Sequence, residues 1–142
     1  LSEESGRRLQ AMYKIISEIE SLGDSGYNIA RILNRLRVHK KNFSDDVCDK
    51  LDHMFDLLDR AFDHMINNLD KGYTKLDGIS NAVDSEGQIN EDRKLLKEEH
   101  LFNLENNKYG CQTGVYYMDI VAECEKAGDY MINVSEAIIE IQ

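Results

Sequence analysis

Residues 15–36 read IISEIESLGDSGYNIARILNRL, and this stretch decides the fold class. Its apolar or small residues recur at alternating spacings of four and three, the pattern of a helix that buries one stripe against its neighbours. The stripe comprises Ile15, Ile19, Leu22, Gly26, Ile29, Leu33 and Leu36. Ser2 or Ser5 can cap the start of this helix. We expect its end between His39 and Asn42, where basic side chains suit the negative end of the helix dipole.

Three further helical stretches are predicted. In the second, which Ser44 can cap, the stripe comprises Val47, Leu51, Met54, Leu58, Ala61, Met65 and Leu69. The third runs roughly from Asn81 or Glu86 to Asn106, and one of its faces carries Ile89, Leu96, His100 and Leu104. The fourth spans about 111–141, with a stripe of Ile120, Cys124, Ala127, Met131, Val134, Ile138 and Ile141. No stretch alternates with a period of two, so the sequence predicts an all-α fold. We expect an antiparallel bundle of three to four long helices that forms one domain over residues 1–142.

The composition excludes several classes of protein. The chain of 142 residues contains no proline, carries a formal net charge of −10 and is 42% hydrophobic. That apolar fraction is sufficient for a packed core, which excludes a disordered acidic tail. The negative charge argues against nucleic acid and anionic lipid as ligands. No apolar run is long enough to cross a bilayer, so direct lipid insertion is not expected either. Because the chain opens at Leu1 without a signal peptide, we interpret it as an excised C-terminal part of a longer protein.

An internal repeat links the first and fourth helical stretches at an offset of 105 residues. Both copies contain E-x-E-x-x-G-D-x-x-x-N. The identical pairs are Ile15/Ile120, Glu18/Glu123, Glu20/Glu125, Gly23/Gly128, Asp24/Asp129 and Asn28/Asn133. A glycine inside a helix costs roughly 1 kcal/mol relative to alanine, and here it occurs in both copies. Either the glycine permits close approach of another backbone, or the neighbouring acidic residues hold a cation, or both.

Each copy carries a ridge of two carboxylates and one amide on the side of the helix opposite its apolar stripe. The ridges comprise Glu20, Asp24 and Asn28 in the first copy and Glu125, Asp129 and Asn133 in the second. Two carboxylates one helical turn apart are a natural ligand pair for a hard cation. The alternative is a solvated acidic face, which acidic bundles possess in quantity.

The repeated element resembles the signature of PhoU-like proteins, which are helical regulators of bacterial phosphate uptake. It reads E-x-x-G-D-x-x-x-N-[IV] in residues 20–29 and again in 125–134. Residues 96–101 (LKEEHL) and 116–120 (YYMDI) look more specifically like the C-terminal cytoplasmic domain of bacterial sodium/phosphate cotransporters. The resemblance covers residues 9 to 138 approximately and implies a PhoU-like bundle with a regulatory, non-catalytic function.

The resemblance also implies partners, a location and a metal. The partner would be the membrane transporter portion of the same chain or another phosphate-transport protein, at the cytoplasmic face of the bacterial inner membrane. Paired E-x-x-x-D elements of this family bind iron or zinc, which carries over to Glu20, Asp24, Glu125 and Asp129. Further candidate ligands are Asn28, Asn133, Asp52 and Asp56. The third helical stretch departs from the family's pattern, since an acid one turn after Asp92 would have to replace Leu96. Two alternatives remain open: a free-standing PhoU-like signalling adaptor, and a carboxylate-rich metal-binding bundle.

The remaining polar residues point to no catalytic site. The second helical stretch carries an acidic stripe of Asp49, Asp52, Asp56, Asp59 and Asp63, which is a solvated flank, a replacement for the missing acidic partner, or a face for a basic protein. None of the four histidines follows a glutamate at the Glu-x-x-His spacing of di-iron bundles, and we expect His100 to pack half-buried. No nucleotide-binding or nucleophile motif is present, so we expect no enzyme. A homodimer is compatible with surplus apolar residues such as Ile16, Tyr27 and Ile132.

Overall fold

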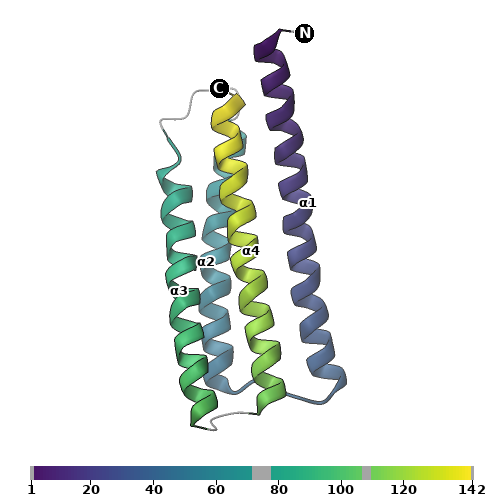
Figure 1. Ribbon diagram of the computed structural model, residues 1–142, viewed down its shortest axis with the longest axis vertical. Helices are drawn as coiled ribbons and strands as arrows, with labels where there is room; N and C mark the ends of the chain where they lie inside the picture. The colour runs from purple at the N-terminus through teal and green to yellow at the C-terminus, as the bar shows by residue number, and fades with distance from the viewer. Residues whose placement is uncertain (1, 72–77, 107–109, 142) are drawn as a thin grey trace.

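The computed structural model describes residues 2–71, 78–106 and 110–141, and these form four long α-helices (Figure 1). Their bounds are Glu3–Val38 for α1, Asp45–Asp70 for α2, Ser80–Glu105 for α3 and Cys111–Ile141 for α4. Helices that follow one another along the chain run antiparallel (Figure 1). The described ranges contain no strand, so the predicted all-α bundle is confirmed. Within these ranges, no helix is both long and apolar enough to cross a membrane.

Serine caps set the starts of the first two helices, as the sequence predicts. The Ser2 hydroxyl accepts a hydrogen bond from the backbone N–H of Ser5 at 3.0 Å, and Ser44 accepts one from Val47 at 3.2 Å. Each bond satisfies one of the N–H groups that the first turn of a helix leaves without a partner. After α1 the chain turns at Lys40, whose φ of 54° lies in the left-handed region.

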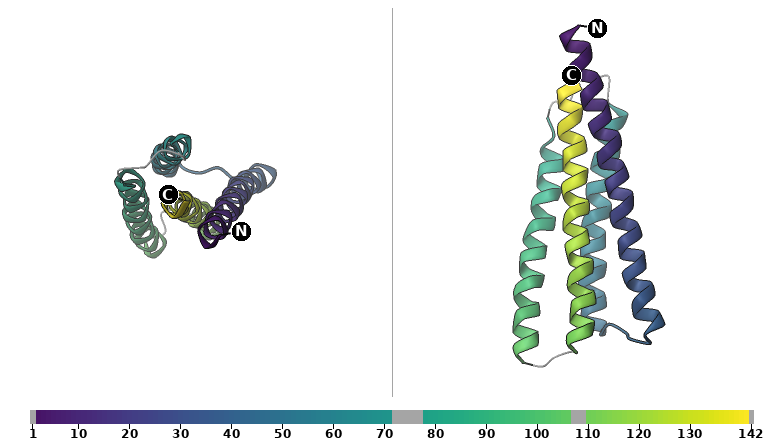
Figure 2. Two further views of the ribbon diagram at one scale, coloured as in Figure 1. Left: turned by 90° about the horizontal axis from the view of Figure 1, so that it is seen from above. Right: turned by 45° about the vertical axis from the view of Figure 1, so that its right-hand side comes forward.

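α4 is the helix around which the other three pack (Figure 2). It contacts α1, α2 and α3, whereas α1 packs against α4 alone among the described helices. The stripe predicted for α4 is buried throughout, except for the half-buried Ile141. The structure also buries residues outside that stripe, namely Gly114, Tyr117, Val121, Gly128, Ser135 and Ala137. Three neighbours therefore cover most of the circumference of α4, where periodicity alone predicted one buried face.

The stripe predicted for α1 is only partly correct. Its covered members are Ile15, Leu22, Ile29 and Leu36, and its exposed members are Ile19, Gly26 and Leu33. The face that contacts α4 is rotated toward Ala11 and Ser25, which are 2% and 3% exposed. The physical reason is that a single neighbour covers a narrower arc of a helix than a bundle core does.

The buried face of α2 includes a polar residue that the sequence did not predict. Leu57 and Asn68 are buried, whereas Leu58 and Leu69, which were predicted in their place, are half-buried. The shift arises because α2 packs against both α3 and α4.

Asn68 joins three helices through its side-chain amide. Its Nδ2 atom donates to Ser135 Oγ of α4 at 3.0 Å and lies 3.3 Å from Asn81 Oδ1 of α3. Ser85 Oγ donates to the Asn81 carbonyl at 3.0 Å and lies 2.6 Å from His64 Nδ1. Because a buried polar group without a partner is costly, this network fixes how α2, α3 and α4 meet near the end of the bundle that holds the C-terminus.

Replacing Asn68 with alanine should therefore lower the free energy of unfolding by about 1–3 kcal/mol, since the buried Ser135 loses its donor. Its exposed neighbour Asn67 offers a matched control, and Asn67→Ala should change stability by less than about 0.5 kcal/mol. Urea denaturation of the two variants measures the difference. Equal effects would show that the amide network does not stabilise the bundle.

Candidate functional site

The structure places the two copies of the repeated motif on adjacent antiparallel helices, α1 and α4 (Figure 1). Asn28 Nδ2 of α1 donates to Glu123 Oε1 of α4 at 3.3 Å. Asn133 Nδ2 of α4 donates to Glu18 Oε2 of α1, also at 3.3 Å. The two asparagines are repeat equivalents of each other, and so are the two glutamates. The pair of bonds is therefore reciprocal, as in a twofold-symmetric contact between two identical subunits.

This arrangement assigns the asparagines a different role from the predicted one. The sequence placed Asn28 and Asn133 on the acidic ridges as additional metal candidates, but both amides donate across the α1–α4 contact. Their angular position explains the difference, because the third member of the ridge lies nearest the flank of the helix that meets its neighbour. Sequence reasoning missed Glu18 and Glu123 as partners, although their identity within the repeat was a usable signal.

The predicted carboxylate ligands do not gather in the structure. Glu20, Asp24 and Asp129 are exposed, and the half-buried Glu125 forms an ion pair with Arg93 of α3 at 3.0 Å between Nε and Oε2. Among the described residues, no group of three or more histidine, cysteine or acidic side chains is placed to hold a metal ion. The arrangement of these residues therefore does not fit an iron or zinc centre, and the metal assignment stays a prediction.

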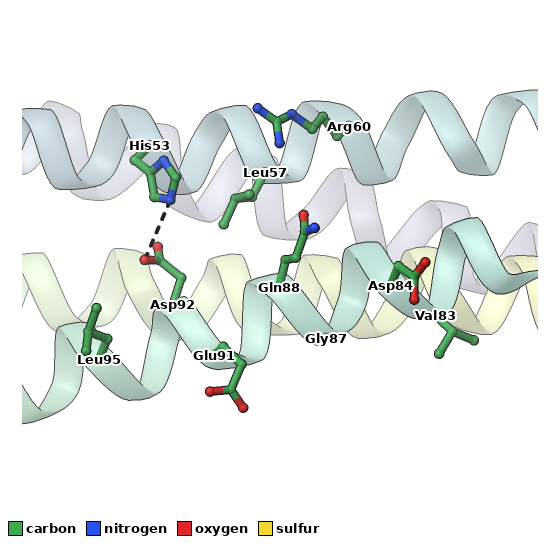
Figure 3. Close-up of a pocket in the computed structure, with 10 residues that line it drawn as sticks. All are labelled: His53, Leu57, Arg60, Val83, Asp84, Gly87, Gln88, Glu91, Asp92 and Leu95. Carbon is green, nitrogen blue, oxygen red and sulfur yellow. Dashed lines mark ion pairs between the residues drawn. The ribbon is translucent and has the colours of Figure 1, made fainter.

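The other metal candidates lie on the outside of α2. Asp52 and Asp56 are exposed, as are the remaining members of the aspartate stripe, Asp49, Asp59 and Asp63. The stripe is therefore a solvated flank in this structure. The neighbouring His53 of α2 lines an open groove between α2 and α3. Its Nε2 atom lies 3.9 Å from Oδ1 of Asp92 on α3, which lines the same groove (Figure 3).

Asp92 is a partly buried ionisable residue of this groove. Its side chain is 12% exposed, and its Oδ2 atom has no hydrogen-bond partner among the described residues. Burial raises the pKa of Asp92, His53 opposes this shift, and the negative charge of Glu99 adds to it. The partly buried position therefore makes the Asp92 carboxyl harder to ionise than a carboxyl in water.

The buried thiol of Cys124 and the half-buried imidazole of His100 pack against neighbouring side chains. Burial raises the pKa of Cys124 to about 12, with Glu123 and Asp92 contributing, so the thiol is not a reactive nucleophile. Burial lowers the pKa of His100, whose ring meets Tyr117 edge-on at 6.3 Å between ring centroids. This placement confirms the half-buried packing that the sequence predicted for His100.

A cluster of three charged side chains links the first turns of α2 to α3. Lys50 Nζ lies 2.9 Å from Asp46 Oδ2 and 2.7 Å from Glu99 Oε2. Burial alone would lower the pKa of Lys50, but the hydrogen bonds to Glu99 and Asp46 outweigh it and raise the pKa above its ordinary value. Lys50 therefore acts as a cationic link between the two helices.

The two repeat glycines differ in their surroundings. A Cβ atom added to Gly128 would lie 3.2 Å from Ile89 Cδ1 of α3, whereas one added to Gly23 would meet nothing within 4 Å. Gly128 therefore allows α3 to approach α4 closely, and Gly23 performs no such role within the described structure. Taken together, the repeated motif is a helix-pairing surface, and the described side chains include no group of three or more histidine, cysteine or acidic residues that could hold a metal ion.

Comparison with known proteins adds no relative. No protein-family model matches the chain, and no curated protein or solved structure shows detectable similarity to it.

The two glycines provide a matched pair of substitutions. Gly23→Ala should raise the free energy of unfolding by about 1 kcal/mol, since alanine is the better helix former and the site is open. At Gly128 the same change must displace Ile89, and overpacking typically costs 1–3 kcal/mol. Gly128→Ala should therefore be the less stable of the two variants in urea denaturation. The asymmetry would be refuted if both substitutions stabilised the protein equally.

Proposed function

We propose that the chain is a non-catalytic regulatory domain of a bacterial sodium/phosphate cotransporter, in which movement of α1 against α4 modulates phosphate transport. The proposal is supported by the resemblance of the repeated element to PhoU-like proteins. The structural observation that carries it is the reciprocal Asn–Glu pairing, which makes that element the contact between two helices. A sequence element that joins two long helices is suited to relaying a mechanical change.

The position of α1 at the outside of the bundle suits it to be the helix that moves. α1 is 36 residues and about 54 Å long, yet it has only one helical neighbour among the described residues. Its most buried residues are the small Ala11 and Ser25, together with Leu36. Because α1 has one helical neighbour, a movement of α1 changes the α1–α4 contact and leaves the contacts among α2, α3 and α4 in place.

Regulation then requires a partner that prefers one position of α1. A partner shifts a two-state equilibrium only by the difference between its affinities for the two states. The partner proposed here is the membrane portion of the same transporter, and the domain acts at the cytoplasmic face of the bacterial inner membrane. No step of this proposal passes through a metal ion, since the candidate carboxylates do not form a ligand set in the structure.

Sodium-dependent phosphate uptake by cells that express the complete gene tests the proposal. Replacing Asn28 and Asn133 together with leucine removes both reciprocal bonds, and uptake should change by at least about twofold at equal expression. The control is Asp59→Asn with Asp63→Asn on the exposed stripe of α2, which should leave uptake unchanged.

Two results would overturn the proposal. One is uptake that is equal in the asparagine variant and the control. The other is a complete gene product without apolar spans of about 20 residues, because the transporter would then be absent from the chain. That second outcome would favour a free-standing phosphate-signalling adaptor.

A further inference from the structure

Exposed apolar side chains of α3 border the groove between α2 and α3. Leu57 of α2 and Gln88 of α3 point into the space between the two helices (Figure 3). Leu95 lines the groove and is 53% exposed, and Phe102, seven residues further along α3, is 59% exposed. Because side chains seven residues apart lie on the same face of a helix, these two extend one apolar line along the groove.

Acidic side chains flank the groove on both sides, also at intervals of seven residues. Asp49 and Asp56 belong to α2, Glu91 and Glu98 belong to α3, and all four are exposed. Each aspartate precedes a residue that lines the groove by four positions, or about one helical turn. Glu91 itself lines the groove, and Glu98 continues its face of α3. Seven residues is the repeat at which a coiled coil places charged side chains beside its apolar seam.

The contacts between α2 and α3 set these acids opposite one another. The ion pair of Lys50 with Glu99, at 2.7 Å, fixes the register of the two antiparallel helices. The residues that precede these two in the chain, Asp49 and Glu98, therefore lie at nearly the same level. Seven residues further along α2 and seven residues back along α3, the second aspartate and the second glutamate face each other in the same way. The groove thus lies between two acidic pairs, which are about 10 Å apart along its length.

Little within the described structure neutralises this negative charge. Of the four acids in the two pairs, only Glu91 has an ion pair with another described residue, which is Lys94 at 3.8 Å. Three acids line the groove and only one arginine does, Arg60. One of these acids is Asp92, whose buried Oδ2 atom has no hydrogen-bond partner among the described residues. The groove therefore offers acceptors for cationic donors from outside the chain.

We propose that the groove between α2 and α3 binds a cationic amphipathic helix of a partner protein. The apolar stripe of that helix packs on Leu95 and Phe102, and lysine or arginine side chains on both of its flanks meet the two acidic pairs. The occupant is a helix because the apolar line and both rows of acids repeat every seven residues, which matches the side-chain repeat of a third helix laid along the groove. The net charge of −10 also favours the approach of a cationic partner.

Binding of a synthetic helical peptide to the 142-residue chain tests the proposal. The probe is a fluorescent peptide of three heptads with leucine at positions a and d and lysine at e and g, and the matched peptide has glutamate in place of lysine. Fluorescence anisotropy in about 0.15 M salt measures both dissociation constants. The lysine peptide should bind at least about tenfold more tightly than the glutamate peptide, and added salt should weaken its binding.

A pair of charge variants locates the peptide on the chain. Asp49→Asn with Asp56→Asn removes one side of both acidic pairs and should raise the Kd of the lysine peptide by about tenfold. The control is Glu20→Gln with Asp24→Asn, which removes two exposed charges from α1, a helix that packs against neither α2 nor α3. That control should raise the Kd by less than about twofold.

A pair of leucine variants tests the apolar line. Leu95→Ser should raise the Kd of the lysine peptide by about fivefold, because the peptide loses an apolar contact. Leu101 is 54% exposed on another side of α3, so Leu101→Ser is the matched control and should leave the Kd within about twofold. All four substituted positions of the groove and its flanks are exposed, and urea midpoints close to that of the parent chain would show that each variant is folded.

Three results would overturn the proposal. The first is equal binding of the lysine and glutamate peptides. The second is equal effects of the groove variants and their controls on the Kd of the lysine peptide. The third is a salt-sensitive dimer of the chain in sedimentation that Asp49→Asn with Asp56→Asn abolishes, which would assign the groove to a second copy. Phosphate uptake enters none of these measurements, so this proposal and the proposed function fail separately.

Discussion

The structure depends on one constraint, which is that α4 must be compatible with neighbours on nearly all its sides. α1, α2 and α3 each contact it, and α1 has no other helical neighbour in the described parts of the chain. α4 meets this demand with apolar residues toward α2 and α3, a glycine where Ile89 approaches most closely, and polar or small residues toward α1. Its burial explains why the core is continuous although the chain is strongly acidic: the acidic side chains of the described residues lie exposed or half-buried on all four helices.

The repeated motif gains a physical meaning from this position. The spacing of its residues is the same in both copies, and it places an asparagine of each helix opposite a glutamate of the other. The same short element therefore forms one side of each of the two bonds. Charged acceptors strengthen such bonds relative to neutral ones, but both pairs are only part-buried, so each bond contributes modestly to the stability of the contact. The two bonds fix the register of α1 on α4, and it is this contact that the proposed regulatory function uses.

Much of the fold was predictable from local sequence, because the signals are local. Ser2 and Ser44 cap their helices through neighbours three residues away, and the heptad stripe of α4 is buried as expected. The covered face of α1 was not predictable, since periodicity does not state how many neighbours a helix has. Leu33 and Ile138 occupy equivalent positions in the repeat, but the first is 40% and the second 1% exposed.

The candidate site was predicted in part. The repeat located the two helices that pair, but helix geometry alone assigned Asn28 and Asn133 to the acidic ridges because it cannot show which flank meets a neighbour. Likewise Gly23 and Gly128 occupy equivalent positions of the repeated motif, and the packing of Ile89 distinguishes them in the structure.

The central claim, that the two motif copies hold α1 and α4 together by reciprocal bonds, is tested most directly by two double-mutant cycles. One cycle combines Asn28→Ala with Glu123→Ala, and the other combines Asn133→Ala with Glu18→Ala. Urea denaturation should give coupling energies of about 0.5–1.5 kcal/mol in both cycles, whereas the unbonded pair Asn28 and Glu18 should be additive. Coupling near zero in both bonded cycles, or in only one of them, would contradict the account.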